Sequence, residues 1–254
     1  MDNGLLDTIL HPHHDKPAWT NWAKNQSCHP TEIFNPETLE ELTKIVFMAK
    51  ADGKKIRCAA SGHSWSSSSV TDGYLVVVNK MEKVHTPIWD NDLKSWTVRI
   101  ETGVLVKDLD DKLRQNDPPL TLPSNVVLDS VRYGGVLSLG CHGAATKTRT
   151  LPDLVSEVTI IDANGDLNTF SEAKNPEEFA AATVNLGLLG VIYTYTLRVE
   201  PMFNLKVMWE HVPGIVPYLR QQANERFDRF EAIRKKYDPN GMFMNATFAG
   251  ILGH

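Results

Sequence analysis

The sequence predicts an α+β domain, because short apolar strands, hairpin turns and amphipathic helices follow one another without the steady strand-helix rhythm of a doubly wound sheet. The 254 residues, 42% of them hydrophobic, are enough for one large domain or two small ones with a core of ordinary size. The three cysteines are widely and irregularly spaced, which argues against a disulfide framework or a zinc ribbon and mildly favours a reducing compartment.

The first predicted elements are a helix and two apolar strands. Apolar residues recur at spacings of three and four before Gly53, which predicts an amphipathic helix that Asn35 or Thr38 caps and Gly53 ends. Residues 56–60 and 74–79 are short apolar runs that predict buried strands. The first of these strands leads directly into a turn that reads Ser-Gly-His-Ser.

The next elements are a strand, a helix and a hairpin. Alternation over Trp96–Gly103 predicts a strand, and a short helix follows from Leu105 to about Gln115. The dipeptide Asn164-Gly165 is a hairpin turn signal between two apolar strands, Val155–Asp162 and Leu167–Phe170.

A helix and a β-branched strand complete the predicted domain. Residues 175–187 predict a helix that a glycine ends, and Val191–Val199 predicts a strand. Residues 1–25 are polar and without period, so we expect an extended N-terminal arm. The predicted domain then covers 26–207, and 208–254 form a short linker and a charged C-terminal helix.

The charge pattern shows no basic patch that would bind nucleic acid. The formal net charge is −5, and Lys and Arg are scattered instead of gathered on one face. Residues 1–20 lack the basic region and long apolar stretch of a secretory signal, and no run approaches a membrane span. We therefore expect an intracellular protein, cytoplasmic or mitochondria-associated, that binds no nucleic acid.

Two glycine-rich segments are candidates for binding the phosphates of a dinucleotide. In the turn Ser61–Ser64, Gly62 tolerates backbone angles that let successive N–H groups point into one concavity. In the tract Gly134–Lys147, several glycines permit close backbone approach, and Ser138 can donate a hydrogen bond. Two such segments can hold a dinucleotide from opposite sides.

Several motifs around these segments stand in a specific order. They are WTNWAKNQSCHPTEIFNPETLEEL, GHSWSSSSVTDGYLVVVNKMEKV, IETGVLVKDLDDKL, GGVLSLGCHGAATK and NLGLLGVIYTYTLRVEP. In order and spacing they resemble the vanillyl-alcohol-oxidase superfamily, and within it the L-gulonolactone and D-arabinono-1,4-lactone oxidase family. The resemblance runs from about Trp19 to Val207 and resumes at Phe230–Asn245, which looks like the family's C-terminal signature.

The resemblance implies a PCMH-type FAD-binding domain of two subdomains with the cofactor extended between them. It also implies an oxidoreductase that oxidises a sugar-derived lactone or polyol by hydride transfer to the flavin, with oxygen or another acceptor as reoxidant. His63 falls on the histidine that covalent members join through a ring nitrogen to the 8α-methyl of FAD. The resemblance places these residues at the cofactor: Ser61, Gly62, His63, Ser64, Trp65, Gly134, Gly135, Ser138, Gly140, His142, Gly143, Val191 and Ile192.

The sequence departs from the family in its linker. Full-length relatives insert a substrate cap before the C-terminal signature, whereas only Met208–Phe227 stands there in this chain. That stretch lacks the Glu-Arg pair and the His-Trp-x-Lys lysine of the cap, so we name no catalytic residue. Apolar surface left uncovered predicts a homo-oligomer or a partner over the flavin face. Val126 aligns near a position that the family's oxidases fill with glycine, so a flavoprotein is implied more firmly than oxygen as acceptor.

Three other interpretations remain open. A truncated relative can bind FAD without turnover. The GHSWS segment nearly spells G-x-S-x-G, which would make Ser64 the nucleophile of a serine hydrolase. The third is a metal site, whose candidate ligands by residue type are His11, His13, His14, Cys28 and His29.

Trp22 is interpreted as a core residue without a site role.

Overall fold

A small parallel sheet and one helix form the first part of the fold. The computed structural model describes residues 17–144, 150–203, 230 and 232–244. Strands β3 (Glu32–Phe34), β5 (Tyr74–Val77) and β4 (Ile56–Ala59) pair in the order β3-β5-β4, all parallel. The predicted amphipathic helix is confirmed as α2 (Leu39–Ala51). The side chain of its N-cap residue, Thr38, accepts a hydrogen bond from the backbone N–H of Glu41. The buried face of α2 packs into the core of this sheet.

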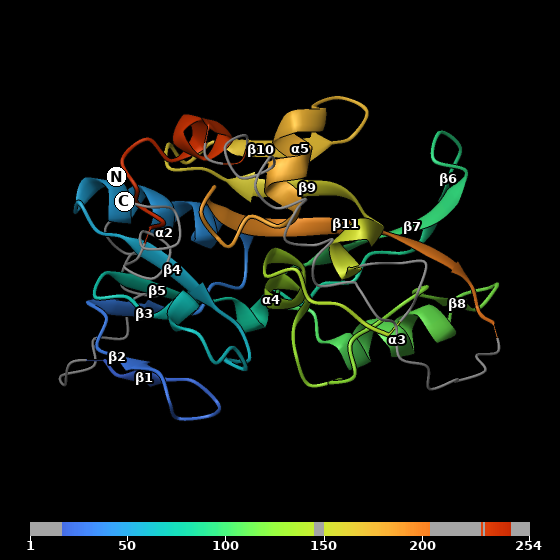
Figure 1. The fold of residues 1–254 in the computed structure, drawn as a ribbon, viewed down its shortest axis with the longest axis horizontal. Coiled ribbons are helices and arrows are strands. Elements are labelled where there is room, and N and C mark those ends of the chain that lie inside the picture. Colours follow the sequence, from blue (N-terminus) through green and yellow to red (C-terminus); the bar gives the residue numbers. More distant parts are fainter. Residues whose placement is uncertain (1–16, 145–149, 204–229, 231, 245–254) are drawn as a thin grey trace, which may run out of the picture.

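A larger antiparallel sheet spans the rest of the domain, as Figure 1 shows. The strands beside one another, in order, are β10 (Leu167–Ser171), β9 (Val155–Ile161), β11 (Val191–Pro201), β7 (Ser95–Glu101) and β6 (Ile88–Asp90). A short strand β8 (Leu120–Thr121) pairs with the end of β11. The hairpin predicted at Asn164-Gly165 is confirmed, because β9 and β10 pair on either side of it. The mixture of two sheets and helices confirms the α+β class.

Three further helices cover the larger sheet. They are α3 (Val106–Arg114), α4 (Tyr133–Ser138) and α5 (Pro176–Thr183). Helix α3 buries a stripe of apolar residues three to four apart, as its sequence predicts. Helix α4 lies in the tract that the sequence marks only as glycine-rich. Its buried Tyr133, Val136 and Leu137 belong to the main core, so tertiary packing explains this short helix better than local propensity does.

The two ends of the described chain lie against the small sheet. Strands β1 (Trp19–Thr20) and β2 (Ser27–Cys28) form a hairpin, although 17–25 belong to the predicted extended arm. The hairpin forms because its turn is tied by hydrogen bonds to the chain after β4. Residues 1–16 and 204–229 lie outside the described part, so most of the predicted arm and linker is not described. No described helix is long and apolar enough to cross a membrane.

Candidate functional site

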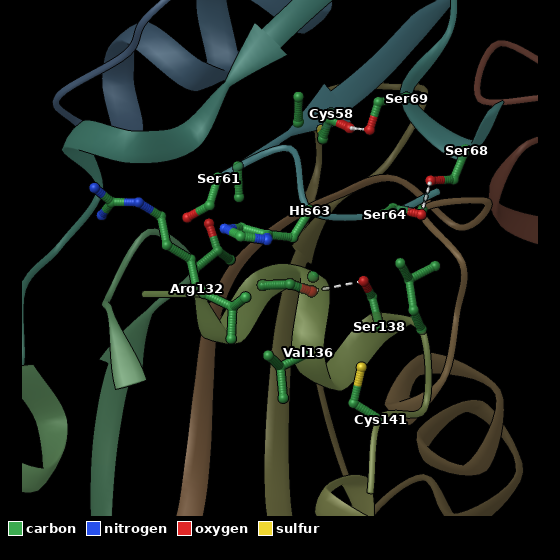
Figure 2. A pocket seen from close by; sticks show the side chains of 18 of the residues that line it. Cys58, Ser61, His63, Ser64, Ser68, Ser69, Arg132, Val136, Ser138 and Cys141 are labelled. Atoms are coloured by element: carbon green, nitrogen blue, oxygen red, sulfur yellow. Dashed lines mark hydrogen bonds between the residues drawn. The ribbon is translucent and has the colours of Figure 1, made fainter. Parts of the chain in front are cut away.

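A cavity of about 530 Å³ lies where the small sheet meets α4 and the start of β11. Figure 2 shows its side chains from close by. Residues from both predicted glycine-rich segments line it, together with residues from the ends of β4 and β7. This volume lies in the range of binding pockets for small molecules and cofactors. The cavity is therefore the candidate binding site of the described chain.

The first wall is the turn Ser61–Ser64, which directly follows β4. Gly62 has φ +69°, a left-handed backbone angle that glycine adopts without strain. The Ser61 hydroxyl donates to the carbonyl of Ser130 at 3.0 Å and thus links the turn to the chain before α4. The His63 side chain points into the space between the two walls (Figure 2).

The second wall is α4, which packs tightly on the end of β7. The amide of Gly134 donates to the Thr102 carbonyl at 2.8 Å, and a Cβ at Gly134 would stand 2.7 Å from that oxygen. A Cβ at Gly135 would meet nothing within 4 Å, so this residue presents bare backbone to open space. The Ser138 hydroxyl donates to the Gly134 carbonyl at 2.6 Å. Its proton is therefore used inside the helix, whereas the sequence predicts that Ser138 donates to a ligand.

The third wall depends on Arg57, a buried cation in the middle of β4. Its guanidinium donates hydrogen bonds to four backbone carbonyls outside β4. These carbonyls belong to Ser68, Leu186, Gly187 and Phe243. Leu186 and Gly187 line the cavity, so Arg57 fixes this wall. Burial lowers the pKa of Arg57 to about 10, and the nearby charge of Asp238 opposes that shift. The guanidinium therefore stays charged at neutral pH.

The thiols of the cavity are poor nucleophiles. Burial raises the pKa of the Cys58 thiol to about 11, although the charge of Arg57 opposes the shift. Burial also raises the pKa of Cys141. Because the thiolate is the reactive form, both side chains are neutral lining groups near pH 7.

Two buried polar atoms of the described chain lack a hydrogen-bond partner at this cavity. They are Oγ1 of Thr102 and Nε of Arg132, and both residues are among those that line the site. Thr102 is 2% exposed. A buried polar group without a partner costs about 1–3 kcal/mol, which a ligand with polar atoms relieves. Unpaired donors beside glycine-lined backbone fit the phosphates and hydroxyls of a dinucleotide such as FAD.

The structure brings most of the predicted site residues to one cavity. The predicted residues that line it are Ser61, Gly62, His63, Ser64, Gly134, Gly135, Ser138, His142 and Ile192. The predicted residues that are not among its lining are Trp65, Gly140, Gly143 and Val191. The Trp65 side chain is 69% exposed, and Val191 is fully buried in the core of the small sheet. Gly143 instead allows close packing, since its Cβ would stand 2.4 Å from the Asn125 carbonyl oxygen.

Sequence reasoning missed Arg57, Thr102 and Arg132. One signal was available for Arg57, because a charged residue inside the apolar strand Ile-Arg-Cys-Ala must find partners when it is buried. Thr102 and Arg132 carry no such local signal. Their place at the cavity follows from the pairing of β7 and from the position of α4.

The serine-hydrolase interpretation finds no support in the surroundings of Ser64. Its hydroxyl contacts the hydroxyls of Ser66 at 2.9 Å and Ser68 at 3.3 Å. The chain continues into a single 3-10 turn, Ser67–Ser69, whereas a nucleophile elbow requires a helix. Neither contact supplies a general base, so the described geometry does not activate Ser64.

The metal interpretation involves histidines outside the described residues. His11, His13 and His14 lie in 1–16, whose structure is not described. Among the described residues, no three His, Cys, Asp or Glu side chains gather as metal ligands do.

Comparisons with known proteins match both the motifs and the fold. The family model described as "FAD binding domain" matches residues 30–171. The chain is 34% identical over 186 residues to L-gulonolactone oxidase of Bos taurus, covering 73% of this chain and 41% of that protein. It is 32% identical to D-arabinono-1,4-lactone oxidase of Candida glabrata, covering 74% of this chain and 36% of that protein. It is 29% identical to L-gulono-1,4-lactone dehydrogenase of Mycobacterium tuberculosis, covering 74% of this chain and 42% of that protein.

A solved structure shows the same fold at low sequence identity. Cholesterol oxidase from B. sterolicum superposes with a TM-score of 0.61 and 19% identity, covering 76% of this chain and 40% of that chain. The chain spans about two fifths of the length of the curated relatives that it matches. The mixed sheets and helices are those of the PCMH-type FAD-binding domain. The chain therefore belongs to the FAD binding domain family, and its cofactor is FAD.

Proposed function

We propose that this chain is the flavin-binding part of an oxidoreductase that oxidises a sugar-derived lactone or polyol. The observation that carries the proposal is one cavity lined by both glycine-rich segments, with the His63 side chain inside it. The relatives support the substrate class, since they are oxidases or dehydrogenases of L-gulonolactone, D-arabinono-1,4-lactone or L-gulono-1,4-lactone. An intracellular location stays a prediction.

The residues of the chain would bind and orient the cofactor. When bound, FAD supplies a ring system that accepts hydride from the carbon to be oxidised and passes the electrons to oxygen or another acceptor. Backbone at Gly135 would approach the cofactor closely, because a Cβ there would meet nothing within 4 Å. Thr102 would offer a hydroxyl to its polar groups, and Arg132 would offer its Nε–H. Nη1 of the Arg132 guanidinium is held by the Gly103 carbonyl and by Glu82 at 3.7 Å. The apolar residues of the lining, among them Val136 and Ile192, would displace water beside the bound cofactor.

His63 would hold the flavin covalently. One ring nitrogen of His63 would give up its N–H proton and form a C–N bond to the 8α-carbon of the flavin, in place of one C–H bond of that carbon. The two electrons and two protons released would go to oxygen, giving hydrogen peroxide, or to another two-electron acceptor. A tethered cofactor cannot dissociate, so the site stays loaded.

The mouth of the cavity exposes apolar side chains that would be covered in the working enzyme. Val127 is 96% exposed and Leu128 is 53% exposed, and both line the cavity. Exposed apolar surface beside a binding site marks a place where another surface packs. A second copy or a partner would supply that cover, as well as the catalytic base. FAD binding without lactone oxidation would instead assign the chain to the alternative, a truncated relative without turnover.

The substitution His63→Ala tests the covalent link. We expect the purified wild-type protein to be yellow and its acid-precipitated pellet to keep the colour. In His63→Ala the flavin should pass completely into the acid supernatant, because no imidazole remains to hold it. Absorbance of pellet and supernatant gives the covalent fraction, and His142→Ala, at a second histidine of the cavity, is the control that keeps a coloured pellet. Equal pellet colour in wild type and His63→Ala would overturn the link.

A lactone assay tests the reaction class. Adding L-gulono-1,4-lactone or D-arabinono-1,4-lactone to the yellow protein without oxygen should bleach the flavin band, because hydride transfer reduces the ring. No bleaching by either lactone, with FAD bound, would contradict lactone oxidation by this chain.

A further inference from the structure

The indole of Trp22 lies stacked on the imidazole of His63. Their ring centroids are 5.0 Å apart and their planes differ by 21°. Trp22 is 64% exposed, so the expectation that it is a core residue is wrong. An aromatic side chain left in solvent contributes little to the core, and the contact it does make is with the histidine at the cavity.

The turn that carries Trp22 is fixed to the histidine loop. Three hydrogen bonds run between them, from Trp22 N to Gly62 O at 2.8 Å, Asn21 Nδ2 to Ser64 O at 2.9 Å and Asn25 Nδ2 to Trp65 O at 3.1 Å. Asn21 is 2% exposed, and its amide also binds Asn25 and the backbone of Gln26. These hydrogen bonds hold the backbone of Trp22 beside the loop that carries His63.

Stacking is the contact that sets the plane of the His63 ring. Within the described chain, no hydrogen bond is made to either ring nitrogen of His63, while the ring points into the cavity (Figure 2). The χ2 torsion of a histidine, about the Cβ–Cγ bond that carries the ring, has a broad distribution without a sharp minimum. The indole therefore restricts this torsion and leaves both ring nitrogens free to react.

We propose that Trp22 is a positioning residue that orients the imidazole of His63 for attachment of the flavin. The inference rests on the covalent link proposed above, and the bonds and electrons are those already given. Trp22 holds the ring plane while a nitrogen of His63 meets the 8α-carbon. Removing the indole lets the ring sample other torsions, so attachment slows although FAD still binds.

The test separates attachment from binding. Flavin-free protein is given saturating FAD, samples are precipitated with acid over time, and pellet flavin is divided by total bound flavin. We expect Trp22→Ala to attach flavin about 2- to 12-fold more slowly, the range that aromatic pair energies imply. Trp22→Phe, which keeps a ring, should restore most of the rate. Where Trp22→Ala does not fold, Trp22→Leu takes its place.

A second tryptophan of the fold gives a matched control. Trp89 is 50% exposed, lies on a hairpin strand and packs edge-on against Trp96 at 6.0 Å, away from the cavity lining. Trp89→Ala should attach flavin at the wild-type rate. Equal rates in wild type and Trp22→Ala would overturn the positioning role alone. Absence of pellet flavin in the wild type would instead overturn the covalent link, and this inference with it.

Nuclear magnetic resonance gives a readout that needs no flavin. The ring current of a stacked indole should move the carbon-bound protons of the His63 ring upfield, and comparison with His63→Gln assigns those signals. The upfield shift should vanish in Trp22→Ala and persist in Trp89→Ala. Identical His63 signals in wild type and Trp22→Ala would show that the stack does not hold the ring.

Discussion

Gly190→Ala is expected to lower the free energy of unfolding by about 2–6 kcal/mol. Gly190 has φ +147°, where an L side chain costs about 1–3 kcal/mol of backbone strain. A Cβ there would also stand 2.2 Å from the Ile161 carbonyl oxygen, and such overpacking costs about 1–3 kcal/mol more. Gly190 precedes β11 and lines the cavity, so the bend it makes joins the sheet to the site. Denaturant unfolding followed by circular dichroism measures the loss.

Gly53→Ala is the matched control for Gly190. Gly53 also has a positive φ, +60°, but its Cβ would meet nothing within 4 Å. This variant therefore carries backbone strain alone and should lose about 1 kcal/mol. If Gly190→Ala were no less stable than Gly53→Ala, the close approach to β9 would not be a feature of the folded protein.

Arg57→Met is expected to lower the free energy of unfolding by about 4 kcal/mol or more. Hydrogen bonds to a charged group contribute about 1.5–3 kcal/mol each, and four carbonyls lose such a donor together. The variant should also bind FAD more weakly, because Leu186 and Gly187 at the cavity lose their anchor. Thermal unfolding and FAD titration measure the two effects.

An exposed arginine gives the control for Arg57. Arg99 lies on β7 with its side chain 54% exposed and pairs with Glu157 at 3.4 Å. Exposed pairs contribute about 0–1 kcal/mol, so Arg99→Met should change little. Similar losses for the two variants would mean that the Arg57 network does not support the fold.

The sequence predicts elements whose signals are local. Helix α2 has its cap, its apolar spacing and its glycine stop within one segment, and the β9-β10 hairpin has its Asn-Gly turn. The short strands β6 and β8 could not be predicted in this way, because partner strands decide whether two or three residues become a strand. Helix α4 contains two glycines and exists because its apolar residues are buried.

The candidate site follows the same division. The two glycine-rich segments are visible in the sequence, since phosphate-binding backbone needs residues that tolerate close approach. That they meet at one cavity, and that Thr102 and Arg132 join them, depends on contacts between distant segments. The stack of Trp22 on His63 also depends on contacts between distant segments, because the sequence around Trp22 does not indicate which residue the indole contacts.

The most direct test of the proposed site is FAD binding to wild type and Gly135→Phe, both prepared free of flavin. A side chain at residue 135 meets nothing within 4 Å at its Cβ and would grow into the cavity, so it should exclude the cofactor without disturbing the packing of α4. Titration by the quenching of FAD fluorescence, with thermal unfolding as the check on folding, measures this. We expect flavin-free wild type to take up FAD and folded Gly135→Phe to take up none. Unchanged FAD uptake by Gly135→Phe, or none by the wild type, would contradict the proposed site.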